Sequence, residues 1–331
     1  MKGIGEGAVE VIIEERKNNG AYKSIFDLTK RVSSRAANKK VMEGLAYAGA
    51  FDCFQNSHRA QYFFQKNGEE GNSALELAIR LGNAFQERND TSQQSLFGEE
   101  SGIELKEPVL PECNEWSRLE RVSKEKEVTG LYISGHPLDD FKFEIKNFCS
   151  HNTMQLKEFE KLKNQEISIA GIVTESLSKI TKTGKPYGAF TLEDYSGSTS
   201  IMVFSEDYMR VHHLLKKNNF LYVRGRVQLR YNSTDQLEFK PSIIILLSDV
   251  CDKYVNSITL KVPSQIVSDE LIHRIKQLVI KNPGRCKLKF VIDDNEEKFS
   301  LEMFSSLFKI NPNREFFSAV DEIDNLKYTL N

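Results

Sequence analysis

The feature that most constrains this chain is a change in the spacing of its apolar residues near residue 166. Before this point they recur every three or four positions, as at Val9, Ile12 and Ile13 within 8–18, which is typical of an amphipathic helix. From Glu166 onward they alternate with polar residues, which is typical of a half-buried strand. The sequence therefore predicts a helical first part and a sheet-forming second part. Its 331 residues suffice for several compact units.

The middle of the chain predicts a β-barrel. Strand-like runs occur at about 166–173, 187–194, 199–204, 221–229 and 236–247. A helical piece, about 206–217, lies between the third run and the fourth. Five strands with a helix after the third is the order expected of an OB-fold. We therefore predict a five-stranded OB-fold β-barrel over 164–250.

The last portion, 251–331, predicts a small α+β domain. Ser268 is placed to cap a helix at about 269–281, and Pro283-Gly284 to end it. A strand is expected on the N-terminal side of this helix. Two strands, a short helix and a final strand are expected after it. The expected strands before the short helix are 257–262, 286–292 and 297–304.

The region before residue 166 is helical with an acidic interruption. Helices are predicted at about 8–18, 38–47 and 58–66. Residues 67–112 contain 3 Lys or Arg against 10 Asp or Glu and many Gly, Ser and Asn residues. We interpret most of this stretch as a loop or linker, with a short helix at 73–81.

A glycine-rich turn, GIGEGA, opens the first helix. Gly3, Gly5 and Gly7 permit a tight turn and a close approach of a phosphate to the backbone. The unpaired amides of the following helical turn favour an anion, and such a contact reads no bases. A dinucleotide-binding loop needs a preceding strand, which the sequence does not show. Phosphate binding and a simple helix-start turn are equally supported by these residues.

The predicted barrel combines cations with aromatic rings, which suits single-stranded nucleic acid. Cations contact phosphates, and rings stack on bases of any sequence. The alternative is that the lysines form a solvated turn and that Phe190 and Tyr222 are core residues; for Phe190 we favour the core. The candidate DNA-binding residues of the first loop, the fourth strand and the last loop are Lys179, Lys182, Lys185, Tyr187, Arg224, Arg226, Arg230 and Tyr231.

The acidic stretch contains an isolated apolar pair within the pentapeptide QQSLF. Leu96 and Phe97 have no nearby core to join, so we expect them, with Gln93, to enter a partner's pocket. Burying both side chains contributes roughly 3–6 kcal/mol before the peptide is ordered. The alternative is that they fold back onto their own domain.

The sequence carries no recognisable catalytic or metal-binding motif. Acidic pairs such as Asp293-Asp294 fall at strand ends or turns, where solvation accounts for them. The 5 cysteines are scattered and never spaced as CxxC, which argues against zinc and disulfides and fits a reducing cytoplasm. We expect neither a bound cofactor nor primer extension by this chain alone.

One stretch resembles a known family. It begins with WSRLE at 116–120 and continues with EKEVTGLYISGHPLD at 125–139. This closely resembles a segment that precedes the OB domain in the α subunit of bacterial DNA polymerase III. Upstream, KGIGEGAVEVIIEER, SIFDLTKRV and AGAFD are similar to that family's tandem helix–hairpin–helix region. Downstream, TKTGKPYGAFTLEDYSGSTSIMVF resembles its OB domain.

The resemblance implies a multidomain α+β architecture and a role in DNA replication. Its divisions are a helix–hairpin–helix domain (1–66), an acidic linker (67–115), a connecting segment (116–163), the OB domain (164–250) and the C-terminal domain (251–331). It implies that the chain corresponds only to the family's C-terminal third, without the Mg²⁺-dependent polymerase domain.

The resemblance also implies partners. The first hairpin would grip duplex DNA, and the OB domain would lie near single-stranded template. Gln93, Leu96 and Phe97 would bind the sliding clamp, and the last domain would dock the clamp loader's τ subunit. Two alternatives stay open: a free-standing single-strand-binding accessory protein, or a fragment of another hairpin and OB enzyme such as a ligase.

Overall fold

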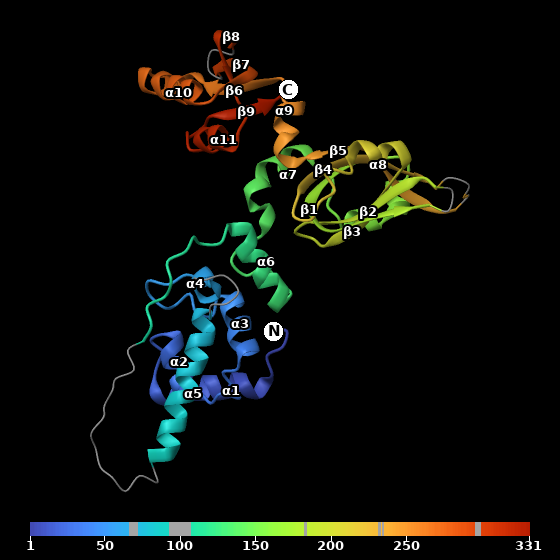
Figure 1. Ribbon diagram of the computed structural model, residues 1–331. Coiled ribbons are helices and arrows are strands. Elements are labelled where there is room, and N and C mark those ends of the chain that lie inside the picture. The colour runs from blue at the N-terminus through green and yellow to red at the C-terminus, as the bar shows by residue number, and fades with distance from the viewer. Residues whose placement is uncertain (66–71, 93–106, 182–183, 231–232, 234, 295–298) are drawn as a thin grey trace. The chain divides into compact units, whose positions relative to one another are not determined.

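The computed structural model describes the chain except for residues 66–71, 93–106, 182–183, 231–232, 234 and 295–298. Two compact units are present, Met1–Pro137 and Leu138–Asn331, and each is described by itself (Figure 1). Within the described residues, no helix is both long enough and apolar enough to span a bilayer.

The first unit is helical. Its α-helices are α1 (Glu6–Asn19), α2 (Ile25–Arg31), α3 (Lys39–Ala48), α4 (Arg59–Phe63), α5 (Ala74–Ser92) and α6 (Arg118–Thr129). Side chains cap several of them: for example, the Ser24 hydroxyl accepts from the Asp27 amide at 3.0 Å, and the Asn38 side chain accepts from the Val41 amide at 3.1 Å. The core includes Phe26, Leu28, Met42, Tyr62 and Leu75.

Helix α5 departs from the sequence prediction, because it extends well beyond the expected 73–81. Its small residues let it approach α2 closely: a Cβ on Gly82 would lie 2.3 Å from the Thr29 carbonyl oxygen. The Gln86 side-chain amide donates to the carbonyls of Thr29 (3.0 Å) and Val32 (2.7 Å). These tertiary contacts override the polar composition from which a linker was predicted.

The second unit begins at Leu138, within the connecting segment. This contains the short 3-10 helices η2 (Pro137–Phe141), η3 (Gln155–Lys157) and η4 (Phe159–Leu162), and helix α7 (Lys142–Phe148). The OB domain follows with β1 (Glu166–Ile180), β2 (Pro186–Glu193), β3 (Ser198–Phe204), α8 (Ser205–Val211), β4 (Phe220–Leu229) and β5 (Leu237–Leu246).

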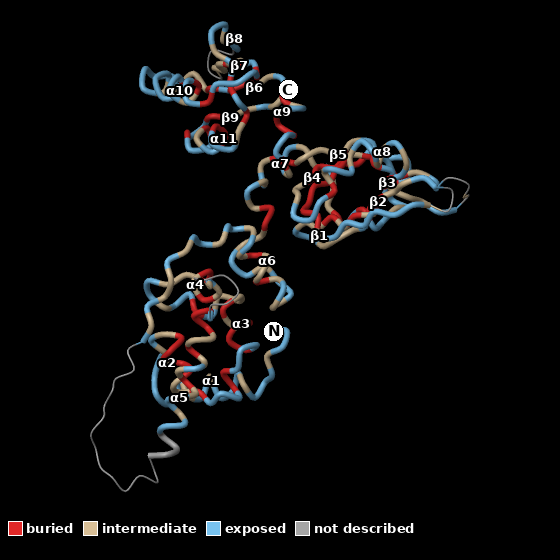
Figure 2. Tube along the Cα trace, viewed as in Figure 1, coloured by how far each residue is buried: buried red, intermediate tan, exposed pale blue. Residues whose placement is uncertain are grey.

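The predicted OB strand order with a helix after the third strand is confirmed. Neighbouring strands pair antiparallel in the order β3-β2-β1-β4-β5, and the core contains Ile167, Phe190 and Val223. The hydrogen-bonded sheet is not closed, so the term barrel applies only loosely. Helix α8 is also shorter than the predicted 206–217 and ends at Val211. Figure 2 shows the buried positions along β1 and β4.

The C-terminal domain follows η5 (Leu247–Asp249) and α9 (Val250–Tyr254). Its elements are β6 (Ser257–Pro263), η6 (Ser264–Ile266), α10 (Asp269–Lys281), β7 (Pro283–Asp294), β8 (Phe299–Ile310), α11 (Arg314–Asp321) and β9 (Lys327–Leu330). The sheet order is β8-β7-β6-β9, with β6 and β7 parallel. This confirms the predicted α+β order. Core residues from the strands and both helices include Ile258, Leu260, Ile275, Leu288, Phe316 and Phe317.

Candidate nucleic-acid interface

The glycine-rich turn at the start of α1 packs against α3. Gly3 has φ +82°, and a Cβ there would lie 2.2 Å from the Lys40 side chain. The Ile4 side chain fills the space beside Gly44, at 3.1 Å from where a Cβ on Gly44 would lie. Gly3 therefore has both a conformational and a steric reason to be glycine, and the turn is held against the helix that carries Lys40.

The same turn leaves amides without acceptors. The Ala8 and Val9 amides bond to the Gly5 carbonyl, whereas the amides of 5–7 make no backbone hydrogen bond among the described residues. Positions Gly5 and Gly7 are open to solvent. This arrangement admits an anion, with Lys40 beside it. Glu6, in the first helical turn, opposes such an anion electrostatically.

The second hairpin, after α3, is held by an ion-pair network centred on the buried Arg59 side chain. The Arg59 guanidinium binds Asp52 at 2.6 Å and Glu125 at 2.7 Å. Burial alone would raise the pKa of Glu125, but hydrogen bonds from Ser134, Arg59 and Ile133 lower it overall. Since these groups satisfy one another, Arg59 acts in folding rather than as a phosphate contact.

The OB domain presents exposed side chains along β1, β2 and β3. Lys179 pairs across from Tyr187, which pairs across from Phe204. The two rings stack with centroids 5.5 Å apart and planes 20° apart. Lys185 is exposed where the first loop enters β2. The adjacent row is apolar and consists of Leu177, Ala189 and Met202.

This surface is accessible to a ligand. Leu177 is 56% exposed, Met202 52% and Phe204 46%. Phe204 and Met202 were not predicted as site residues, although a signal existed: they alternate with Ile201 and Val203, which are buried. Phe190, by contrast, is 1% exposed and lies in the core, as favoured from the sequence.

The arginines of β4 do not join this cluster. Arg226 pairs across from Glu166 at the first residue of β1, whereas Lys179 lies near the other end of that 15-residue strand. Arg224 forms an ion pair with Glu166, with Nε 3.1 Å from Oε1. Arg230 is exposed after the end of β4. The predicted DNA-binding residues are therefore divided between two surfaces.

Tyr222 does not offer a stacking surface on β4. It is 4% exposed and packs in a cluster with Leu138, Leu247, Val250 and partly buried Tyr254. The connecting segment and α9 thus cover this part of the sheet, and among the described residues the β1–β3 surface offers exposed aromatic rings.

Several predicted residues lie outside the described part of the chain. These are Lys182, Tyr231 and the three residues of the predicted clamp motif, Gln93, Leu96 and Phe97. The chain flanking the motif is held on the first unit. On the far side, the Glu107 carboxylate accepts from the Ser24 hydroxyl at 2.8 Å and pairs with Lys30 at 3.1 Å.

Two of the pockets in the second unit differ in their chemistry. An apolar pocket of about 320 Å³ lies between α10 and the sheet, lined by residues such as Leu271, Ile275, Phe290 and Met303.

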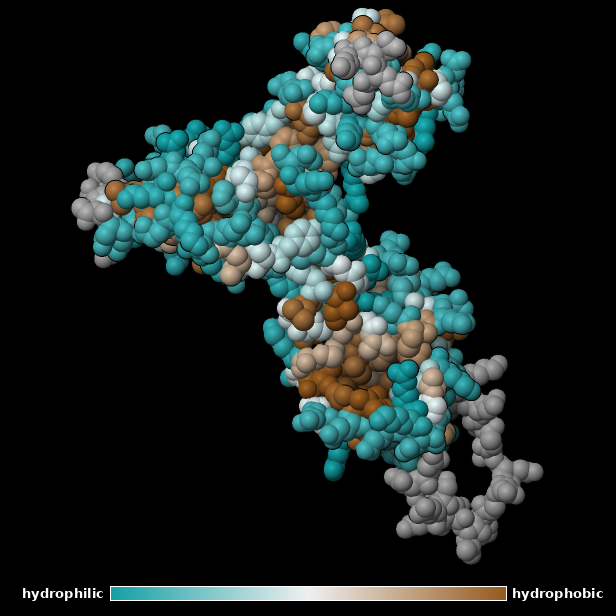
Figure 3. Space-filling model, turned by 180° about the vertical axis from the view of Figure 1, so that it is seen from behind, coloured by the Kyte–Doolittle hydropathy of each residue, from teal (hydrophilic) through white to brown (hydrophobic). Residues whose placement is uncertain are grey.

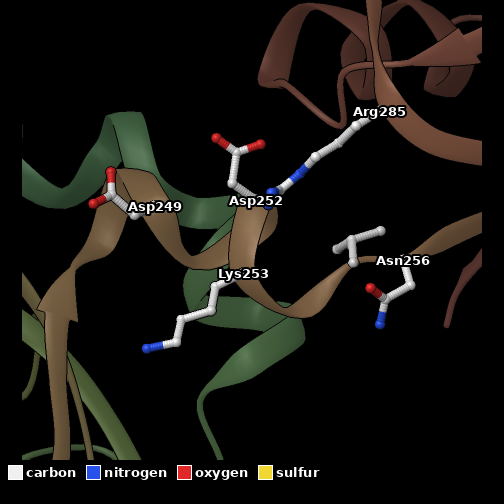
Figure 4. Close-up of a pocket in the computed structure, with 6 residues that line it drawn as sticks. Asp249, Asp252, Lys253, Asn256 and Arg285 are labelled. Atoms are coloured by element: carbon white, nitrogen blue, oxygen red, sulfur yellow. The ribbon is translucent and has the colours of Figure 1, made fainter.

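A polar pocket of about 520 Å³ lies beside α9 (Figure 4). Asp249 and Asp252 line it together with Lys253 and Arg285, and Arg285 extends toward Asp252. Balanced charges favour neither an anion nor a cation there. In the described part of the chain, no cluster of three or more potential metal ligands occurs.

Comparison with known proteins gives three domain matches. Residues 1–62 match a helix-hairpin-helix motif, and 167–247 match an OB-fold nucleic acid binding domain. Residues 258–331 match the C-terminal domain of the DNA polymerase III alpha subunit. The second of these descriptions places residues 167–247 in the class of OB-fold nucleic-acid-binding domains.

Whole-chain comparison identifies the relatives. DNA polymerase III subunit alpha of Escherichia coli is 28% identical over 283 residues, covering 84% of this chain and 23% of the relative. The same protein of Borreliella burgdorferi is 28% identical over 337 aligned residues, covering 99% and 27%. The chain is thus similar to the C-terminal region of the bacterial DNA polymerase III alpha subunit, as predicted, and spans about a quarter of these relatives' length.

Solved OB structures also align with the chain. The second OB-fold domain of replication protein A from Methanococcus maripaludis is 22% identical and covers 29% of this chain and 94% of that one, with a TM-score of 0.20. A similarity of this size adds nothing to the assignment made from the strand order.

Proposed function

We propose that this chain holds primer–template DNA for a replicative polymerase and ties that polymerase to its sliding clamp and clamp loader in the bacterial cytoplasm. Its contribution is processivity rather than nucleotidyl transfer. The observation that carries the proposal is the stacked Tyr187–Phe204 pair beside Lys179 on an exposed OB surface. The similarity to the polymerase alpha subunit supports the replicative context.

The OB surface suits single-stranded template. Lys179 and Lys185 supply cations for phosphates, and the exposed ring of Phe204 offers a platform for one base. Leu177 and Met202 extend the apolar surface for a neighbouring base or sugar. None of these groups reads a base edge, so binding is tolerant of sequence, as a replicative enzyme requires.

The hairpin suits the duplex side of the same substrate. The amides of 5–7 and Lys40 together can hold one backbone phosphate, and glycine at Gly5 and Gly7 leaves room for its approach. Such a contact is independent of sequence and positions the duplex without reading it.

Single-strand binding is tested by replacing both rings. We expect Tyr187→Ala/Phe204→Ala to weaken binding to a fluorescent single-stranded oligonucleotide roughly ten- to a hundredfold, because stacking contributes ~1–3 kcal/mol per base. Tyr195→Ala is the matched control, since Tyr195 is 50% exposed and directly follows the β2–β3 turn residue Asp194. Equal affinity of the double variant and the control would refute the proposal that this OB surface binds the single strand.

The clamp tether is tested separately. Leu96→Ala/Phe97→Ala is expected to abolish binding of the chain to the bacterial sliding clamp, and Gln93→Ala to weaken it. Support comes from the acidic, polar surroundings of these residues and from the anchoring of Glu107 on the first unit. Single-strand affinity serves as the control, because these residues lie outside the OB domain. Clamp binding that survives the double substitution would contradict the tether.

Loader docking is proposed for the apolar pocket under α10. Ile272 is 56% exposed at its rim, and an apolar segment of the τ subunit would bury it. Ile272→Glu is expected to weaken τ binding at least tenfold, because a carboxylate in that contact lacks a partner. Gln277→Glu, at an exposed α10 position that does not line the pocket, is the control. Unchanged τ binding by Ile272→Glu would exclude the pocket.

A further inference from the structure

The C-terminal sheet has two faces of opposite chemistry. Residues at even positions of β6 and β7, such as Ile258, Leu260 and Leu288, are buried in the core shared with α10 and α11. Residues at odd positions lie on the other face, because successive side chains of a strand point to opposite sides. We refer to this other face as the lysine face.

The strand register gathers scattered lysines on the lysine face. Lys287 on β7 lies directly opposite Lys309 on β8, and Lys261 on β6 lies directly opposite Lys327 on β9. All four are exposed. Lys289 lies between these pairs and binds Glu302 at 2.5 Å. Among the described residues of the paired strands, the lysine face carries two carboxylates, Glu302 and Asp293. The five lysines therefore leave this face with a net positive charge.

The two lysine pairs are unfavourable for folding. Like charges directly opposite on neighbouring strands repel, because their Cβ atoms lie only about 5 Å apart. In the described part of the chain, no carboxylate lies within ion-pair distance of Lys261, Lys287, Lys309 or Lys327. Such an arrangement is relieved when the surface meets a polyanion.

An exposed aromatic ring lies within the same surface. Phe304 on β8 pairs across from Lys289, is 72% exposed, and has the Lys289 ammonium 5.4 Å from its ring centroid. An acidic protein segment would match the lysines but would leave this ring exposed. A nucleic-acid strand uses both features, because phosphates bind the cations while a base stacks on the ring.

We infer that the lysine face is a second binding surface for single-stranded nucleic acid. The four exposed lysines contact phosphates, and Phe304 stacks on one base. This goes beyond the proposed function, which assigns the single strand to the OB domain and the opposite, helix-covered side of this sheet to a protein partner. The same small domain can therefore hold a protein segment on one face and nucleic acid on the other.

The test uses charge reversal in the full chain. Lys261→Glu and Lys287→Glu each convert a repulsive pair into an attractive one, so the thermal midpoint is expected to stay level or rise. Affinity of the double variant for a fluorescent oligothymidylate is expected to fall roughly tenfold. The slope of log K against log salt is expected to become shallower by about 0.7 for each phosphate that the variant no longer binds. Lys276→Glu/Lys281→Glu, at two exposed positions of α10, is the control of equal charge change.

The ring is tested by photocrosslinking. An oligonucleotide containing 5-iodouracil is expected to crosslink to the peptide carrying Phe304, and Phe304→Leu to abolish that crosslink while keeping an apolar side chain. Phe304→Ala is expected to lower affinity about tenfold.

The outcomes separate this inference from the proposed function. If both lysine variants keep parental affinity and salt slope while Tyr187→Ala/Phe204→Ala weakens binding, the inference is wrong and the OB assignment stands. If neither set changes binding, both are wrong. If the lysine variants lose binding to oligoglutamate but not to DNA, the face is a protein-docking surface and the inference is overturned.

Discussion

The OB sheet and the C-terminal sheet each bury one face, but they differ in what covers the other. In the OB domain, the connecting segment and α9 cover Tyr222 on β4, which leaves the aromatic surface on β1–β3. In the C-terminal domain both helices pack with the core face, and exposed lysines occupy the opposite one. Packing against neighbouring segments, rather than strand composition, thus decides which surface of a sheet remains free for a ligand.

Apolar side chains are exposed on both of these domains. The space-filling view in Figure 3 shows brown apolar atoms among teal polar ones on the C-terminal domain. Its exposed apolar residues include Ile272, Met303, Phe304 and Leu307. The OB domain exposes a similar set that includes Leu177, Ile180 and Met202, so exposed apolar side chains alone do not separate the two domains.

The largest expected effect compares the two cores. Phe190→Ala in the OB domain and Phe316→Ala in the C-terminal domain remove rings that are each 1% exposed. Each should lower the free energy of unfolding by about 3–5 kcal/mol in urea titrations. Phe190→Ala should also lower single-strand affinity, because the strands that carry Tyr187 and Phe204 lose their shared core.

If the OB surface and the lysine face bind DNA independently, the Phe190→Ala variant still crosslinks to DNA through the peptide that carries Phe304. This is measured under conditions where the C-terminal domain stays folded. Loss of that crosslink without loss of the C-terminal fold would mean that the two surfaces bind DNA only as one site.

A smaller effect is expected where β4 and β5 approach each other closely. A Cβ on Gly225 would lie 2.4 Å from the Lys240 carbonyl oxygen and 2.7 Å from the Pro241 Cα. Both are backbone atoms beside a register shift between β4 and β5, so Gly225→Ala should destabilise the OB domain by about 1–3 kcal/mol. Gly7→Ala is the control in the urea titration, because nothing lies within 4 Å of its position. If Gly225→Ala leaves the free energy of unfolding unchanged, the two strands can move apart at this bulge to admit the methyl group.

The junction between the OB domain and the C-terminal domain supplies a pH-dependent prediction. Glu144 on α7 is 8% exposed and its Oε2 lacks a hydrogen-bond partner among the described residues. Burial raises the pKa of this carboxyl above its ordinary value, although Arg314 lowers it in part. Below the unfolded-state pKa both states carry the neutral acid, and stability is unaffected. As pH rises through the folded pKa, stability is lost because the charge forms in a buried site.

Glu144→Gln should therefore remove one component of this decline, and the variant should exceed the parent by about 1–2 kcal/mol above the folded pKa. Thermal midpoints measured from pH 4 to 8 check it. Parallel curves for parent and variant would place the titrating group elsewhere.

Sequence patterns predicted the strands of the two sheets better than they predicted which residues meet on the sheet surfaces. Alternation marks parts of the OB strands, although β1 buries residues 167–173 without a break. The first loop places its lysines close together in the chain. The pairing of Arg224 with Glu166 joins residues 58 positions apart and could not be foreseen from spacing. The lysine face depends on strand register in the same way, because Lys261 and Lys327 become neighbours only when β9 pairs with β6. Helix α5 was underestimated because its stability comes from contacts with α2.

The smallest expected effect sharpens the comparison from the OB side. Arg226 lies directly opposite Lys240, and both are exposed, so this sheet also contains a repulsive pair. Lys240→Glu should raise the free energy of unfolding by about 0.2–1 kcal/mol, because it places opposite charges across the two strands. Differential scanning calorimetry checks the stability, and oligonucleotide binding is measured on the same preparation.

The two residues that lie directly opposite Arg226 are Glu166 and Lys240, and neither carries a ring. The lysine face differs, because Phe304 lies directly opposite Lys289. We therefore expect Lys240→Glu to change the salt slope for duplex or single strand by about one phosphate contact or less. If Lys240→Glu leaves the crosslinks to 5-iodouracil oligonucleotides unchanged, the surface around Arg226 contacts only the phosphate backbone of the nucleic acid. A loss of affinity as large as that of Tyr187→Ala/Phe204→Ala would instead make the β4–β5 surface the principal DNA site of the OB domain and reverse the comparison.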